Sequence, residues 1–123
     1  YAMRGAKLLL VVSNFPNPKL HHWRTLLQAR AIENQFTVVA ANRVGAAETS
    51  TYFGHSLAID AWGEIVAEGD DQEGIMTAEI DVAKCSDVRR LIPMFSDRQP
   101  NAYPIDLLKP ASFLAEKKAG RQE

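Results

Sequence analysis

The sequence is poor in cysteine, with Cys85 as the one thiol among 123 residues. A single thiol cannot form a disulfide within the chain, which excludes the disulfide-stapled class of small secreted domains. This cysteine usage is typical of a reducing compartment. We therefore expect a cytoplasmic location.

The sequence also lacks a bias in charge and a long hydrophobic run. Its 14 Lys and Arg residues face 15 Asp and Glu residues, the net charge is -1 at pH 7, and the two signs are interspersed. A basic surface for nucleic acid or anionic lipid is therefore not expected. The longest apolar runs, 8–12 and 38–41, are far shorter than the roughly 20 residues that a membrane-spanning helix needs. We expect neither nucleic acid nor a membrane as a partner.

What remains is an ordinary globular composition, 46% hydrophobic and 24% charged, which fits one domain with a core. Its first six residues look like the last turn of a helix that stops at Gly5, because glycine takes the left-handed conformation at low cost. A helix that ends at residue 4 must begin elsewhere. We therefore expect the natural protein to start before Tyr1.

The hydrophobic pattern predicts an α/β fold with one mixed sheet, a long helix and a short helix. A nearly continuous apolar run over 7–13 is typical of a strand buried on both faces. The long helix is expected over 18–35, with Asn17 as its cap and Pro18 in its first turn. Its core face is Leu20, Trp23, Leu27 and Ala31, whereas Arg24 and Gln28 fall towards solvent.

The rest of the pattern predicts more strands and then the short helix. The expected strands are 36–42, 54–60, 64–68 and 74–81, of which the last three are separated by turn signals of hairpin length. Asp81 is expected to cap the short helix, 82–91, which Pro93 ends.

Cysteine and histidine offer little chemistry here. A nucleophilic Cys85 would need a general base or a lowered pKa, and its position near the start of the last helix could favour the thiolate only slightly. A structural or surface thiol is the preferred interpretation. His21 and His22 are adjacent on a helix, where side chains point about 100° apart, and His55 has no partner at ligand spacing. We predict no metal site.

Two other places carry polar groups of interest. Glu33 lies on a helix face beside Leu26 and Ala29, and a half-buried carboxylate there must be paired, with Arg30 as the local partner. An anchoring role is preferred over acid-base chemistry. The loop 14–16 follows the first strand at its carboxyl end, where open α/β sheets place ligand contacts. On these local grounds Asn14, Phe15 and Pro16 could form a pocket wall or a plain loop.

Several short motifs keep a characteristic order and spacing. The chain closely resembles the second half of the nitrilase-superfamily carbon-nitrogen hydrolases, most of all the omega-amidase branch. The resemblance covers residues 1–103 and leaves 104–123 as a C-terminal tail. The motifs that carry it are Asn14-Phe15-Pro16, His22-Trp23, Arg30-Ala31 with Glu33-Asn34, Gly54-His55-Ser56, Trp62-Gly63 and Ile92-Pro93.

The resemblance implies a four-layer α-β-β-α sandwich of which this chain forms the second half. It also implies amide hydrolysis through a Cys thioester, with a Glu, a Lys and the Cys that all lie upstream of the matching region, so no catalytic residue is expected in this chain. Small linear amides such as 2-oxo acid omega-amides are the implied substrates, with no cofactor.

The resemblance further assigns the loop 14–16 to the border of the substrate pocket, and Arg30 and Glu33 to the architecture. It gives His22-Trp23 no metal role. We expect a homo-oligomer that assembles through the 18–35 helix. The alternative is a non-catalytic half-sandwich that serves as an interaction or dimerisation module.

Overall fold

A computed structural model describes residues 1–102 of the chain. The predicted tail, 104–123, lies outside the described residues. Two 3-10 helices, Ala2–Arg4 and Pro100–Ala102, flank the other elements. These are β1 (Leu8–Ser13), α1 (Leu20–Asn34), β2 (Thr37–Asn42), β3 (Val44–Ala46), β4 (Thr51–Phe53), β5 (Leu57–Ile59), β6 (Ile65–Glu68) and α2 (Lys84–Leu91).

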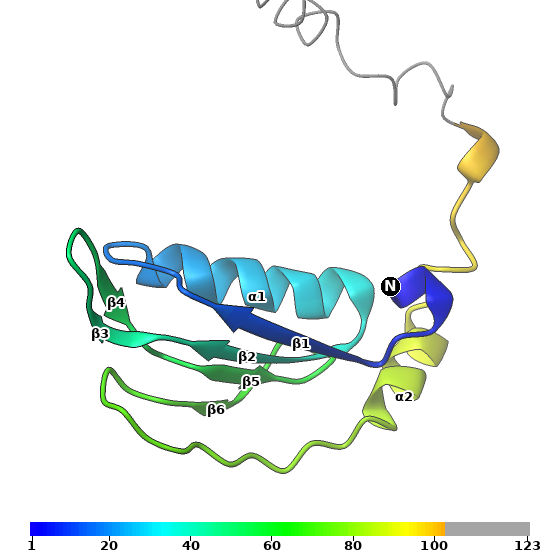
Figure 1. Cartoon of the computed structure of the whole chain (residues 1–123). Helices are drawn as coiled ribbons and strands as arrows, with labels where there is room; N and C mark the ends of the chain where they lie inside the picture. The colour runs from blue at the N-terminus through cyan, green and yellow to red at the C-terminus, as the bar shows by residue number, and fades with distance from the viewer. Residues whose placement is uncertain (103–123) are drawn as a thin grey trace, which may run out of the picture.

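The main sheet has four strands in the order β1-β2-β5-β6. Strands β1 and β2 are parallel and joined by α1, whereas β5 and β6 add in antiparallel fashion. Helix α1 runs along one face of this sheet, and the short hairpin of β3 and β4 extends from one end of it (Figure 1). The predicted α/β class with one mixed sheet, a long helix and a short helix is confirmed.

The core lies between α1 and the sheet. Trp23, Leu27 and Ala31 are buried on the helix, and Val38 and Leu57 are among the buried residues that meet them from the strands. These three helical positions recur at intervals of four, so they share one face of the helix. The predicted core stripe of α1 is confirmed.

Two predicted strand segments are wrong. Residues 74–81 form no strand, because β6 ends the main sheet and no neighbouring strand offers these residues a ladder. Residues 54–56 precede β5 rather than belong to it, since Gly54 and His55 have φ angles of 67° and 51°, in the left-handed region that a strand excludes. The β3–β4 hairpin, which lies between the predicted strands 36–42 and 54–60, was not predicted.

Both predicted helix caps are also wrong. Asn17 does not cap α1, which begins at Leu20, because the Asn17 side chain donates instead to Thr51 Oγ1 at 3.0 Å. Asp81 accepts from the Ala83 N–H at 2.8 Å, which closes a turn ahead of α2 rather than capping the helix itself. Gly5 does end its short helix at φ 89°, as predicted.

Strand β1 is buried on one face only, which corrects the prediction of burial on both. Leu9 and Val11 pack against the core, whereas Leu10 and Val12 on the other face are 68% and 91% exposed. Helix α2 covers only the start of that face, where the Cys85 thiol reaches the Lys7 carbonyl. A bare apolar strip therefore remains on the sheet.

Polar residues of α1 also differ from expectation. Arg24 and Gln28 do not point into solvent: both are partly buried, and they bind Glu68 and the Gly63 carbonyl near the two ends of β6. Arg30 and Glu33 form the expected ion pair, but both side chains are 51% exposed. Glu33 is therefore more exposed than predicted.

Replacing Glu33 is expected to change the stability of this chain only slightly. An exposed pair at this helical spacing contributes about 0.2 to 0.5 kcal/mol, so Glu33→Ala should lower the melting temperature by less than about 4 °C. Differential scanning calorimetry would measure this, with Asp87→Ala as the control, because Asp87 forms another exposed pair with Arg90. A fall above about 10 °C would show that Glu33 is an essential anchor.

Candidate functional site

The loop 14–16 leaves β1 at its carboxyl end, where the sequence predicted ligand contacts. Asn14 is exposed, whereas the Phe15 ring turns inward and stands 5.5 Å from Trp23 and 6.2 Å from Phe53, measured between ring centres. Pro16 pairs with Tyr52 of β4 through a single bridge. Of the three residues, Asn14 is the one whose side chain is free to meet a ligand, and Phe15 holds the loop down.

Asn42, at the matching end of β2, was not singled out from the sequence. The residue is 9% exposed, and its side chain accepts a hydrogen bond from the Phe15 N–H at 2.7 Å. It also donates to the Phe15 carbonyl at 3.1 Å and to the Gly54 carbonyl at 2.9 Å. One amide therefore joins the loop after β1 to the loop before β5. The rule that identified Asn14, polar residues at strand ends, applies equally to Asn42.

An open hollow of about 970 Å³ lies beside this strand end. The end of β2 and the segment after β6 form its walls, with Asn42, Ser56 and Asp70 among the polar lining residues. The lining does not include Asn14, Phe15 or Pro16. The described residues thus bring Asn42, but not the predicted loop side chains, to the hollow.

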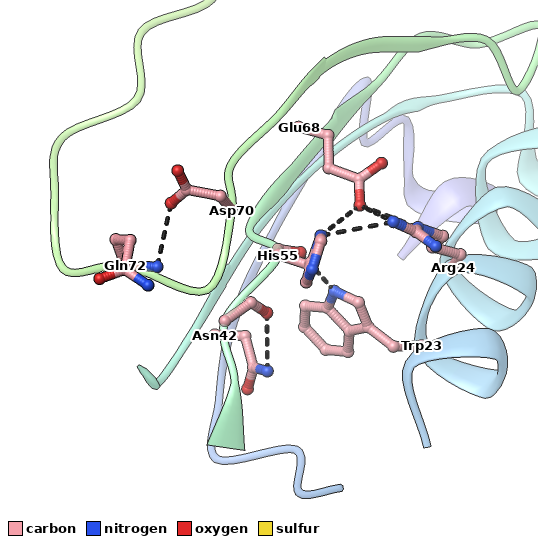
Figure 2. A network of polar contacts seen from close by, with 8 residues as sticks. Trp23, Arg24, Asn42, His55, Glu68, Asp70 and Gln72 are labelled. Carbon is pink, nitrogen blue, oxygen red and sulfur yellow. Dashed lines mark hydrogen bonds and ion pairs between the residues drawn. The ribbon is translucent and has the colours of Figure 1, made fainter. Parts of the chain in front are cut away.

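Three of the residues that line the hollow, Arg24, His55 and Glu68, form a cluster of polar contacts (Figure 2). Glu68 Oε1 accepts from Arg24 Nε at 2.8 Å and lies 2.7 Å from His55 Nδ1. The backbone of His55 is held as well, because Trp23 Nε1 donates to its carbonyl at 2.8 Å. The cluster links α1 to β6 and to the turn before β5. Because its members contact one another, the cluster holds the turn before β5 in place.

The amino-acid sequence matches known proteins over most of its length. Residues 1–90 match the family model described as carbon-nitrogen hydrolase. The chain belongs to the carbon-nitrogen hydrolase family. Its relatives include a 2-oxoglutaramate amidase from Bacillus subtilis (strain 168), 45% identical over 103 residues, and an omega-amidase from Homo sapiens, 32% identical over 114 residues. These alignments cover 84% and 89% of this chain, and 40% and 41% of the relatives.

Solved structures of the family have the same fold. The nitrilase and fragile histidine triad fusion protein of Caenorhabditis elegans superposes with a TM-score of 0.77 at 40% identity, over 85% of this chain and 26% of that one. A carbon-nitrogen hydrolase from Helicobacter pylori G27 superposes with a TM-score of 0.75 at 32% identity, over 88% and 43%. This chain thus spans about two fifths of the length of several curated carbon-nitrogen hydrolases. The resemblance and the nitrilase-type fold are confirmed.

Cys85 is not placed as a nucleophile of this carbon-nitrogen hydrolase chain. The thiol is fully buried, donates to the Lys7 carbonyl at 3.3 Å and lies 3.7 Å from Thr37 Oγ1. A reactive thiol needs access and a base or positive charge beside it, and these contacts supply neither. The geometry fits a structural thiol that joins α2 to the start of β1.

The histidines are dispersed over the molecule. His21 and His22 are exposed side by side, with ring centres 6.1 Å apart, whereas His55 belongs to the Glu68 cluster. Within 1–102, no three His, Cys, Asp or Glu side chains gather closely enough to hold a metal ion. The same stretch contains no helix with the length and hydropathy to cross a membrane.

Proposed function

We propose that this chain is the carboxyl-terminal part of an amidase that hydrolyses the terminal amide of small linear amides, such as 2-oxo acid omega-amides. The observation that carries the proposal is the 45% identity to a 2-oxoglutaramate amidase, within a match to the carbon-nitrogen hydrolase family. We further propose a cytoplasmic location, which the single buried thiol supports.

In the proposed reaction a Cys outside this chain is the nucleophile. Its thiolate attacks the amide carbon, a Glu protonates the departing nitrogen, and ammonia leaves a thioester behind. Water activated by the same Glu then releases the carboxylic acid and the free thiol. A Lys stabilises the oxyanion in both steps. These three groups belong to the upstream part of the protein, and no cofactor takes part.

This chain contributes one wall of the substrate pocket in the proposed enzyme. Asn14 supplies a polar amide at the carboxyl end of β1. Phe15 and Pro16 hold the backbone beside it in place through contacts with Trp23 and Tyr52. An amide side chain can donate to a carbonyl oxygen and accept from an N–H of the substrate. That pairing suits a small polar amide.

The alternative is a non-catalytic half-sandwich that dimerises. The bare strip on β1, with Leu10 and Val12 exposed, favours it. Reading the coding sequence ahead of Tyr1 separates the two functions. A Glu, a Lys and a Cys-Tyr-Asp stretch at family spacing are expected there, and a start codon directly ahead of Tyr1 would favour the module.

The proposed enzyme is also a homo-oligomer that uses helix 18–35. Leu26 on α1 is an exposed large apolar residue, which supports the surface around it as an interface.

Asn14 is expected to matter for turnover and little for stability. The test system is a reconstituted assembly: this chain co-expressed with the part of the Bacillus subtilis 2-oxoglutaramate amidase that its match leaves uncovered. Asn14→Ala should lower kcat/KM of the assembly for 2-oxoglutaramate by about 10- to 100-fold, the scale of one lost polar contact. The exposed Asn101→Ala serves as the control. Unchanged kcat/KM in Asn14→Ala would remove Asn14 from the pocket.

A further inference from the structure

A single side chain holds both backbone polar groups of Phe15. Asn42 Oδ1 accepts from the Phe15 N–H at 2.7 Å, and Asn42 Nδ2 donates to the Phe15 carbonyl at 3.1 Å. Such a double contact fixes the peptide plane on each side of the residue, because neither group can turn without losing its partner.

Asn42 is itself held in place. Its backbone N–H donates to Ser56 Oγ at 3.1 Å, and its Nδ2 also reaches the Gly54 carbonyl at 2.9 Å. In the parallel ladder it stands opposite Ser13, the last residue of β1. The Asn42 side chain therefore has one available orientation. Through it, the end of β2 fixes the loop that follows β1.

Asn14 lies between two fixed points, Ser13 in the ladder and Phe15 under Asn42. Its own side chain is exposed, so the backbone on both sides sets the direction of its Cα–Cβ bond, and no contact of the side chain with the described residues does. An exposed side chain that must meet a substrate in one geometry depends on such support.

We propose that Asn42 is a positioning residue for the amide hydrolysis, acting through Phe15 to aim Asn14 at the substrate. The inference rests on the proposed function and deepens it. Asn42 does not touch the substrate in this account. Its replacement should alter catalysis only by way of Asn14, which gives the proposal two separate tests.

The first test measures the contact in this chain, without any assay of activity. Site-resolved hydrogen exchange of Asn42→Ala should show the Phe15 amide exchanging at least about tenfold faster, because it loses its acceptor. Gln28→Ala is the matched control, since Gln28 also donates a side-chain amide to a backbone carbonyl, that of Gly63, at 3.0 Å. Its Phe15 rate should not change. An unchanged rate in Asn42→Ala, or an equal rise throughout β2, would overturn the local role.

The second test is a double-mutant cycle in the reconstituted assembly. Asn42→Ala is expected to lower kcat/KM about 10- to 100-fold, and Asn14→Ala added to it should cause little further loss, because the two residues act as one unit. In the double variant of Gln28→Ala and Asn14→Ala, the fold-losses in kcat/KM of the two single variants should multiply. If the fold-losses of Asn42→Ala and Asn14→Ala also multiply in their double variant, the proposal is overturned.

Asn42→Asp covers the case in which the alanine variant does not fold. It keeps an acceptor for the Phe15 N–H but sets a carboxylate oxygen against the Phe15 and Gly54 carbonyls. The Phe15 amide should stay protected while kcat/KM falls, and wild-type kcat/KM would overturn the proposal. If the unmodified assembly shows no turnover, the proposed function is overturned, and with it the role of Asn42 in catalysis. The exchange rate of the Phe15 amide would still show whether Asn42 holds the Phe15 backbone.

Discussion

The purified chain alone is expected to release no ammonia from 2-oxoglutaramate above the buffer background. A positioned nucleophile and its base supply most of the rate in thioester chemistry, and loss of either removes on the order of 10⁴-fold or more. Cys85, the one thiol of the chain, is fully buried against Lys7 and Thr37. It has neither the access nor the base that attack on an amide requires.

A coupled assay for ammonia would measure this result over several hours at high protein concentration. Cys85→Ala is the informative comparison, and its signal should equal that of the unmodified chain at background. Ammonia release that disappears in Cys85→Ala would contradict the account, because it would make Cys85 the nucleophile and this chain a complete enzyme.

The isolated chain is also expected to associate into dimers or larger species. Strand β1 is at the edge of the sheet, so its outer backbone groups are open, and its bare face carries Leu10 and Val12. An open strand edge beside exposed apolar side chains is a template for pairing with another chain. Burial of this strip by a second molecule would remove both features.

Light scattering across a tenfold range of concentration would measure the association. Leu10→Lys with Val12→Lys should shift the chain towards monomer, because charges on the strip oppose its burial. Ile75→Lys is the matched control: Ile75 is 97% exposed in the segment after β6 and should leave the assemblies intact. A variant at Leu26 tests the α1 surface in the same way. A stable monomer of the unmodified chain at all concentrations would contradict the expectation.

The helix and the parallel strands were predictable from the sequence because their signals are local. Spacing by four gave the buried face of α1, and apolar runs gave β1 and β2. The β3–β4 hairpin was not predictable in this way, since its segment is rich in small residues and depends on contacts from elsewhere, such as the Asn17 N–H to the Thr51 carbonyl at 2.9 Å. Residues 74–81 show the converse case, an apparent strand for which the sheet has no neighbour.

The site was predictable only in part for the same reason. Asn14 follows an obvious strand and could be inferred from that position alone. The contacts of Asn42 with Phe15, and of Arg24 with Glu68, join residues 27 and 44 positions apart. Hydrophobic periodicity does not report such pairs. The exposure of Val12 could not be predicted from the sequence either. The apolar run of β1 is the same whether or not a second layer covers that face of the sheet.

The most direct test of the central claim is ammonia release from 2-oxoglutaramate by the reconstituted assembly. We expect turnover that neither this chain nor the co-expressed Bacillus subtilis part shows separately, because the proposed nucleophile and the proposed wall with Asn14 lie in different parts. The two parts should first be shown to co-purify as a stable complex. A stable complex that releases no ammonia would contradict the claim that this chain completes an amidase.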